Sequence, residues 1–390
     1  MVRDGARATV LAGLVVTAAA LAAAGPPSVP HPQLPAEVIR YSGTDKPLEG
    51  RLAWALAEAP KCDRGRGVWI GYSVRRLMGE HSMIGSWSDD RTRSTLTITE
   101  ILAGKREAAS LTAGEDSVRR TAKDVLESIE NKKQERKIWK DIGILCRYDF
   151  AKPAVLDAVR MSNLDLSFDF EDRPLVWIGG ASDEESLAAI KQLFDESRRD
   201  KVRENLIAAA GVHGSPALVI PFLEKILTGK DSEHLRKEAA FWIGEQDDAS
   251  GLRILVRAAQ TDASHEVREG AVFAISQVSL PEAVDELIAL ARGASQADVR
   301  KQSVFWLGQI ASKKAGAALE DFARNGGSLE IQEQAVFALS ELPDNQGLEP
   351  LIKLAKTHPD PRIRKKAVFW LGESKDPRAL QTLVDIIKGK

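Results

Sequence analysis

The sequence predicts an all-α α-α superhelix, a solenoid of helical hairpins, preceded by a small mixed α+β domain. Three observations predict it. Ten-letter segments such as RKQSVFWLGQ recur with a period of 32 residues, each copy follows a second apolar segment of helical length, and the letters between the two are turn formers. A period in this range is typical of solenoids, in which each unit is one supersecondary structure that buries its apolar face against its neighbours.

Residues 1–24 have the pattern of a secretory signal peptide, because two arginines precede an apolar run from Ala8 to Ala24 that ends in small residues. The alternative is an uncleaved membrane anchor, but the run is alanine-rich and short for a span of about 20 residues. Residues 25–35 are Pro-rich and are expected to form an extended tether. We therefore expect export, to the periplasm or to the medium, and no membrane span once the signal is cleaved.

Residues 36–180 contain no clean copy of the repeat and are expected to form the mixed domain. The local apolar patterns predict a helix from Arg51 and strands from Gly67, Ser94 and Asp141. The letters PLVWIGG from Pro174 resemble the repeat segment. They leave open a decayed unit at the end of this domain, although the proline would prevent a full helix there.

Cys62 and Cys146 are the two cysteines of the chain. An exported chain meets an oxidising compartment, so we predict a disulfide between them, which would stabilise the fold by about 4 to 5 kcal/mol in the chain-entropy relation. The alternative is a pair of buried thiols. The sequence contains neither a CxxC nor an HExxH motif, and it predicts no metal site and no cofactor.

Residues 182–390 divide into six helix pairs and a last helix. Equivalent apolar positions of the second helices stand 32 residues apart, at Leu235, Val267, Val299, Ile331 and Ile363. Three residues before them, at the expected helix starts, stand Ser232, Ser264, Gln296, Ser328 and Asp360. Four of these five side chains are of types that cap helices. The last helix is predicted to cap the core with an apolar stripe of Leu380, Leu383, Val384 and Ile387.

The core VRxxAxxAL of segments such as VREGAVFAI resembles the HEAT-repeat family, in particular the short HEAT-like repeats of the phycobilisome-lyase type, over about residues 182–390. The resemblance implies a superhelix with a curved surface for other proteins, but HEAT repeats carry many functions. Units of the family often place an aspartate six residues before the repeat arginine. Here only Asp262 before Arg268 keeps that spacing, and Gln332 replaces the arginine in its unit.

Three columns of the second helices alternate with a period of 64 residues, and one of them alternates glycine with serine at Gly244, Ser276, Gly308, Ser340 and Gly372. Large and small side chains alternate at Trp242, Ala274, Trp306, Ala338 and Trp370, and charges alternate at Lys237, Glu269, Lys301, Glu333 and Lys365. An indole beside a methyl group fills space that two indoles would overfill, so we predict that the tryptophans belong to the core. Equivalent helices of neighbouring units pack about 8 to 10 Å apart, so the charged column is predicted to form a ladder of ion pairs.

A phenylalanine recurs outside the core stripe of five second helices, at Phe241, Phe273, Phe305, Phe337 and Phe369. Two interpretations are open. The rings either wedge between adjacent second helices, or line the inner curved surface and bind an extended segment or a helix of a partner. In the second interpretation the flanking partner-binding residues are Glu245, Gln277, Gln309, Glu341 and Glu373.

Bulk charge and motifs exclude several classes of function. The formal net charge is −2, and the alternating charges cancel along the second helices, which argues against a nucleic-acid partner. The six histidines are scattered, and the adjacent Asp89 and Asp90 have no nucleophile or base motif beside them, so no catalytic residue is predicted. The sequence favours an exported scaffold that binds a protein partner of the cell envelope. The alternatives are an enzyme or enzyme accessory, lyase-like or active through the amino-terminal domain, and a structural spacer.

Overall fold

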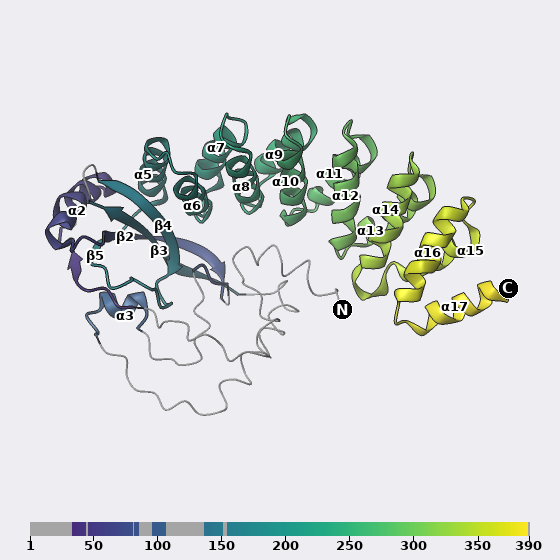
Figure 1. Cartoon of the computed structure of the whole chain (residues 1–390), viewed down its shortest axis with the longest axis horizontal. Helices are drawn as coiled ribbons and strands as arrows, with labels where there is room; N and C mark the ends of the chain where they lie inside the picture. Colours follow the sequence, from purple (N-terminus) through teal and green to yellow (C-terminus); the bar gives the residue numbers. More distant parts are fainter. Residues whose placement is uncertain are drawn as a thin grey trace, which may run out of the picture. The chain divides into compact units, whose positions relative to one another are not determined.

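The computed structural model describes residues 33–43, 46–80, 82–85, 96–106, 136–150 and 154–388. The predicted signal peptide, most of the tether and the pair Asp89–Asp90 lie outside these residues. Within them the fold is the predicted α-α superhelix, preceded by a small strand-containing region (Figure 1). Contacts divide the chain into two compact units, the first ending at Gly214 and the second beginning at Ser215. None of the described helices combines the length and apolarity that crossing a membrane requires.

The first unit is built on a five-stranded sheet with the strand order β1-β5-β2-β3-β4. Strand β3 is antiparallel to β2 and β4, whereas β5 is parallel to β1 and β2. The strands are β1 (Val38–Arg40), β2 (Val68–Gly79), β3 (Lys137–Asp149), β4 (Val155–Asn163) and β5 (Leu175–Gly180). The strands predicted from Gly67 and Asp141 are β2 and β3.

The segment PLVWIGG forms β5 and not a decayed helical unit. This strand lies between β1 and β2, and its residues Leu175, Val176 and Ile178 are all buried. A short apolar run covered on both faces of a sheet resembles a buried helix segment in sequence, which is why the repeat-like letters were ambiguous.

Helices cover both faces of this sheet. On one side Trp69 of β2 packs in a core with Ile98 and Leu145, and on the other side the Tyr72 hydroxyl lies 2.9 Å from that of Ser186. The helices are α2 (Leu48–Cys62), α3 (Ile98–Leu102), α5 (Asp183–Glu196) and α6 (Asp200–Gly211). The strand predicted from Ser94 is wrong over residues 98–102, which form α3, because a capping box between Thr97 and Glu100 starts a helix there. Just before α3, Thr97 makes an isolated antiparallel bridge with Ser167.

The predicted disulfide is not formed, since both cysteines are free, buried thiols. Cys62 ends α2, and its Sγ donates to the carbonyl of Ala59 in the same helix at 3.2 Å. Cys146 lies in the middle of β3 and pairs with Ile70 of β2 and Val159 of β4. Burial raises the pKa of the Cys146 thiol to about 12. Each thiol is therefore held among the neighbours of its own element, as in the alternative that the sequence left open.

Helices α5 and α6 pack with the sheet in the first unit. Arg76 of β2 donates to the carbonyl of Gly211 at the end of α6, at 3.1 Å, and α6 packs against β4. At the start of α2, the backbone N–H of Leu48 donates to the Glu185 carboxylate of α5 at 3.1 Å. The compact first unit thus extends one helix pair beyond residue 180.

The second unit, as far as it is described, is a curved row of helix pairs (Figure 1). The first helices of the pairs are α7 (Pro216–Leu227), α9 (Ala249–Thr261), α11 (Glu282–Gly293), α13 (Lys313–Asn325), α15 (Leu348–Thr357) and α17 (Pro377–Ile387). The second helices are α8 (Glu233–Gly244), α10 (His265–Gln277), α12 (Ala297–Gln309), α14 (Leu329–Glu341) and α16 (Pro361–Glu373). A single 3₁₀ turn, Pro343–Asn345, precedes α15.

Side chains of the repeat fix the start of several second helices. Ser264, Ser328 and Asp360 each accept a hydrogen bond from a backbone N–H of the first turn, whereas Ser232 makes no capping hydrogen bond. Three of the five predicted capping positions therefore act as caps. Gln296, which is not of a capping type, makes no capping bond either.

The repeat arginine ties together the two helices of a pair. Nη1 of Arg268 donates to the carbonyls of Asp262 and Ala263 in the loop between α9 and α10. Arg300 and Arg364 bind the equivalent loops in the same way. Where glutamine replaces the arginine in α14, its side-chain amide donates to the carbonyl of residue 324 at 3.3 Å. These bonds satisfy carbonyl groups that the end of the first helix leaves without helical partners.

The 64-residue alternation sets the spacing of the second helices. A Cβ on Gly244 would lie 2.8 Å from the Ala274 carbonyl oxygen, and a Cβ on Gly308 would lie 2.8 Å from that of Ala338. Small residues thus bring α8 against α10 and α12 against α14. Between these close pairs an indole intervenes, since Trp306 of α12 contacts the ring of Phe273 of α10.

The tryptophans are packed less deeply than predicted. Trp242 is buried, but Trp306 and Trp370 are half-buried. Ala274 and Ala338, which alternate with them, are fully buried as predicted. The indoles lie on the side of the second helices where neighbouring units meet, and their outer edges reach the surface there.

The last helix departs from the predicted cap. Ala379 and Thr382 are its buried residues, whereas Leu380 and Ile387 of the predicted apolar stripe are 67% and 85% exposed. Residues 383 and 384 of that stripe are half-buried. Helix α17 therefore leaves most of the apolar stripe uncovered within the described residues.

Candidate partner-binding surface

The second helices form the inner layer of the curved row. Neighbouring second helices pack against one another far more extensively than neighbouring first helices do. Since a row of pairs bends toward the layer in which the helices lie closer together, the second helices face the inside of the curve. The surface that they share is long, continuous and built from equivalent residues.

The recurring phenylalanines lie on this layer and are joined through the tryptophans into one continuous row of rings. Successive rings are separated by 4.9 to 6.3 Å between centroids. We call this set the aromatic row, which runs in the order Trp242, Phe241, Phe273, Trp306, Phe305, Phe337, Trp370 and Phe369. Two of its contacts are parallel stacks, with interplanar angles of 6° and 15°.

The aromatic row is neither core nor free surface. The four phenylalanines from Phe241 to Phe337 are half-buried, and Phe369 is 55% exposed. Each ring therefore contributes one face to the packing between second helices and leaves an edge outward. This geometry combines the two interpretations of the phenylalanine column, because a ring that wedges between helices also lines their shared surface.

The predicted flanking residues lie one turn beyond the phenylalanines, at the carboxyl ends of the second helices. Glu245, Gln277 and Glu373 are exposed, and Gln309 and Glu341 are half-buried. The Gln277 amide donates to the neighbouring Ser276 hydroxyl at 2.9 Å. The structure thus places all five beside the aromatic row, along one edge of the inner layer.

The charged column pairs differently from the predicted ladder. Lys237 of α8 pairs with Glu266 at 2.8 Å and not with Glu269, and Lys301 of α12 pairs with Glu330 and not with Glu333. Each lysine therefore reaches a glutamate one turn nearer the start of the next helix. The prediction named the wrong partners for the lysines. Neighbouring second helices are offset from one another along their axes, and the sequence period does not reveal this offset.

A largely buried ion pair of this layer joins Arg268 of α10 to Asp298 at the start of α12. Nε and Nη2 of Arg268 donate to one carboxylate oxygen of Asp298 at 3.0 and 2.7 Å, and His265 lies 2.7 Å from the same oxygen. Burial raises the pKa of Asp298, but hydrogen bonds from His265 and Arg268 outweigh it, so the net pKa is lowered. The pKa of His265 is raised, chiefly by its bond to Asp298.

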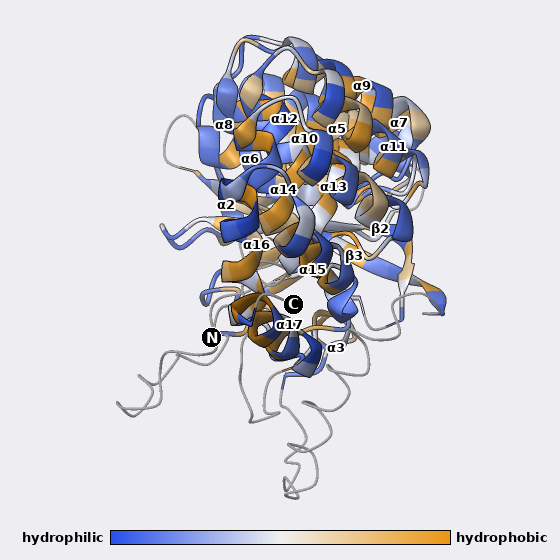
Figure 2. Cartoon of the chain, turned by 90° about the vertical axis from the view of Figure 1, so that its right-hand side faces the viewer, coloured by the Kyte–Doolittle hydropathy of each residue, from blue (hydrophilic) through white to orange (hydrophobic). Residues whose placement is uncertain are grey.

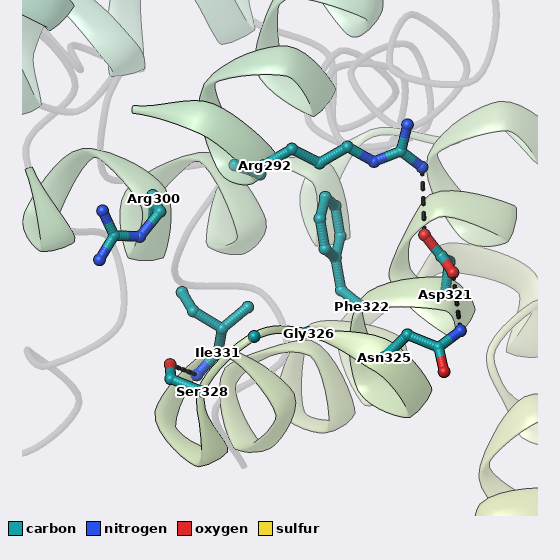
Figure 3. A pocket seen from close by; sticks show the side chains of 10 residues that line it. Arg292, Arg300, Asp321, Phe322, Asn325, Gly326, Ser328 and Ile331 are labelled. Carbon is teal, nitrogen blue, oxygen red and sulfur yellow. Dashed lines mark hydrogen bonds and ion pairs between the residues drawn. The ribbon is translucent and has the colours of Figure 1, made fainter. Parts of the chain in front are cut away.

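A cavity of about 420 Å³ opens where the helix pair α11–α12 meets α13 and α14 (Figure 3). The Arg292 guanidinium pairs with Asp321 at 3.1 Å and lies over the ring of Phe322, and the Asn325 amide also donates to Asp321. Its polar lining is thus largely paired within itself. A second, apolar groove of about 890 Å³ lies in the first unit between α2, α5 and β4.

The remaining titratable groups do not assemble a reactive site among the described residues. There, no three of the His, Cys, Asp and Glu side chains lie close enough to hold a metal ion. Of the predicted scattered histidines, His31 and His81 lie outside the described residues. His213 and His358 are buried singly, in different units.

The profile of HEAT repeats matches residues 220–308, 255–327 and 316–390. Residues 220–390 therefore contain segments that match HEAT repeats. A comparison with curated protein sequences finds no match. The HEAT repeats here are therefore defined by the profile, by the repeat arginine and by consecutive helix pairs.

Solved structures similar to this chain include human deoxyhypusine hydroxylase in complex with glycerol, at 21% identity over 50% of this chain and 76% of that one, with a TM-score of 0.23. The CpcE and CpcF complex of phycocyanin lyase from Nostoc sp. PCC7120 is 19% identical over 49% and 76%, with a TM-score of 0.30. Kap121p bound to RanGTP is 14% identical over 51% and 27%, with a TM-score of 0.31. We draw no function from these similarities.

Proposed function

We propose that this protein is an exported scaffold whose aromatic row binds a protein partner in the cell envelope. The observation that carries the proposal is the continuous row of half-exposed rings along the inner layer of a HEAT-repeat array. Aromatic side chains provide large, rigid contact areas and dominate binding energy at protein interfaces. Export rests on the pattern of residues 1–24. The proposal assigns binding, and no catalysis, to the chain.

The residues beside the aromatic row indicate the charge of the partner. Three of the five flanking positions are glutamates at the carboxyl ends of helices, where the helix dipole disfavours negative charge by about 0.3 to 1 kcal/mol each. A cationic partner would offset that cost. We therefore expect the bound segment to present apolar side chains to the rings and lysine or arginine to the glutamates.

Site-specific photo-crosslinking in the producing cells tests the proposal. A photo-reactive phenylalanine analogue at Phe305 keeps a ring in the aromatic row and should yield one discrete adduct, identified by mass spectrometry. The same analogue at Arg257, an exposed residue of the first-helix layer, is the matched control and should yield no such adduct. Fractionation of the same cells should place the chain outside the cytoplasm, with residues 1–24 removed.

Three outcomes would count against the proposal. Equal adducts from Phe305 and Arg257 would show that the aromatic row is not a specific surface. An adduct that survives replacement of Phe273 and Phe337 by alanine, in a chain that remains folded, would place binding elsewhere. Recovery of the chain from the cytoplasm, with residues 1–24 still attached, would contradict export.

A further inference from the structure

Helix α16 repeats, at equivalent positions, the residues with which α8 and α12 hold the next second helix. In α8 three residues contact α10: Lys237 pairs with Glu266, Phe241 stacks on Phe273 at 6.3 Å, and Gly244 allows the close approach of Ala274. In α12 the residues 64 positions later make the same three contacts with α14, through Glu330, Phe337 and Ala338. The two interfaces are copies of one another.

In α16 the same three positions are occupied by Lys365, Phe369 and Gly372. Lys365 is exposed and has no ionic partner within the described part of the chain, and Phe369 is 55% exposed. A Cβ on Gly372 would meet nothing within 4 Å. Every element of the interface is thus present on α16, and among the described residues no helix covers it.

Helix α17, which packs against α16, also exposes apolar side chains. Its Leu380 and Ile387 correspond, 128 positions earlier, to Leu252 and Ala259 of α9, which are buried. Helix α9 packs chiefly against α10, the second helix of its own pair. The exposed side of α17 is therefore the side that a second helix covers in the complete pairs. Figure 2 views the chain from this end and shows the apolar residues of α16 and α17 in orange.

We propose that α16 and α17 together bind one amphipathic helix of a partner protein, in the position of a further second helix. The two internal copies define its chemistry. It carries a small residue to fit against Gly372, an aromatic residue just before it to stack on Phe369, and a carboxylate eight positions before the small residue to pair with Lys365. Its apolar stripe covers Leu380 and Ile387 of α17. This surface is distinct from the aromatic-row interaction proposed above.

Charge favours such a partner over a second copy of this chain. Helix α16 is basic, with Arg362, Arg364, Lys365 and Lys366 against Glu373. A second copy whose α16 took the parallel orientation of a further second helix would bring these cations against their own copies, which is repulsive. The acidic helices of this chain that would fit, α10 and α14, are already packed inside the row.

A peptide derived from the chain itself tests the proposal. The probe is a fluorescent peptide with the sequence of residues 328–342, which contains Glu330, Phe337 and Ala338. Its binding to the 390-residue chain is measured by anisotropy. We expect saturable binding that Gly372→Leu weakens at least tenfold, because the new side chain fills the space of the close approach. Lys365→Glu should weaken it about three- to fivefold, as expected for an exposed ion pair.

A charge exchange makes the test specific. The peptide with Glu330→Lys should bind the Lys365→Glu chain as well as the original pair binds, which a merely structural effect of either change would not produce. Arg253→Glu on α9, an exposed position with the same charge change, should leave binding unchanged. The crosslinks formed from Phe305 should persist in the Gly372→Leu chain. A wrong proposal for α16 and α17 can therefore be distinguished from a wrong proposal for the aromatic row.

Two results would overturn the proposal. One is peptide binding that is absent, or equal in the original and Gly372→Leu chains. The other is a chain that elutes as a dimer by light scattering and becomes monomeric in Gly372→Leu, which would assign this surface to a second copy.

Discussion

His213 and His265 show how the surroundings of a single residue set its charge. The ring of His213, just after α6, is buried, and its Nδ1 lies 3.1 Å from the Ala210 carbonyl. Burial lowers its pKa, and the opposing attraction of Asp183 is smaller. His265 is exposed at the start of α10, and the hydrogen bond to Asp298 raises its pKa. Protonation therefore opposes folding at the first site and favours it at the second.

Acidification is expected to weaken the first unit through His213. Its pKa in the folded chain lies below the ordinary value of 6.5, so the unfolded chain binds the proton more readily. The free energy of unfolding should then fall as pH drops below 6.5, by at most about 1.4 kcal/mol per pH unit. Urea unfolding between pH 7.5 and 5.5 measures this slope, which should be shallower in His213→Gln.

The matched control has the opposite sign. The contribution of His265 is present below pH 6.5 and is lost as pH rises through its raised pKa. Removing it in His265→Gln should make the loss of stability on acidification steeper. A slope that is unchanged in His213→Gln would contradict the assignment to that buried ring.

At the scale of helices, the array is organised by the close pairs α8–α10 and α12–α14. Glycine and alanine allow contact in these pairs, and a tryptophan separates each pair from the next. The ion pairs follow the same period, since Lys237 and Lys301 both reach across a close pair. One packing rule thus sets helix spacing, charge pairing and the positions of the rings.

Glycine-to-alanine changes at two equivalent positions should have opposite effects on stability. In Gly308→Ala the new methyl group would lie 2.8 Å from the Ala338 carbonyl, so α12 and α14 must separate. Overpacking of this kind costs about 1 to 3 kcal/mol. In Gly372→Ala the methyl group meets nothing, and the helix should gain up to about 0.5 kcal/mol.

Urea denaturation of the two variants measures both changes. Equal changes in the free energy of unfolding at the two positions would show that local helix propensity determines the effect of these glycines. The close approach of second helices would then not be the cause. The comparison also establishes that α16 tolerates side chains at Gly372, on which the peptide experiment depends.

At the scale of the whole molecule, the chain consists of two compact units with different principles of construction. The first is held by long-range strand pairing, for example between β2 and β3, and by helices on both faces of the sheet. The second is held by contacts between consecutive helices and between neighbouring pairs. Stability of such a row is a sum over pairs and their interfaces, whereas the sheet forms as a whole.

The second unit is therefore expected to fold without the first. A fragment of residues 215–390 should show the helical circular dichroism of an array and unfold in urea with a broader transition than a globular domain of the same size. The fragment of residues 1–214 is the counterpart, with a sharper transition. A 215–390 fragment that lacks helical structure would contradict the division between Gly214 and Ser215.

Much of the candidate surface could be read from the sequence. The phenylalanine column stands at a fixed register and lies on the inner layer, and its flanking residues follow it in space as they do in sequence. The sequence did not reveal that Trp306 and Trp370 join the phenylalanines into a single row, because that contact depends on the distance between helices of different pairs. The open end at Lys365 and Gly372 was likewise hidden, because these letters are the same as in covered units.

The sequence alone determined the helix pairs, their period and the buried positions from Leu235 to Ile363 that recur in the second helices, because an apolar stripe and a capping residue act within one helix and need no knowledge of its neighbours. Only the tertiary structure decided that Cys62 and Cys146 stay thiols, that Lys237 pairs with Glu266 rather than Glu269, and that the stripe of α17 is exposed. These outcomes depend on distances and axial offsets between elements, which are set by packing over the whole chain.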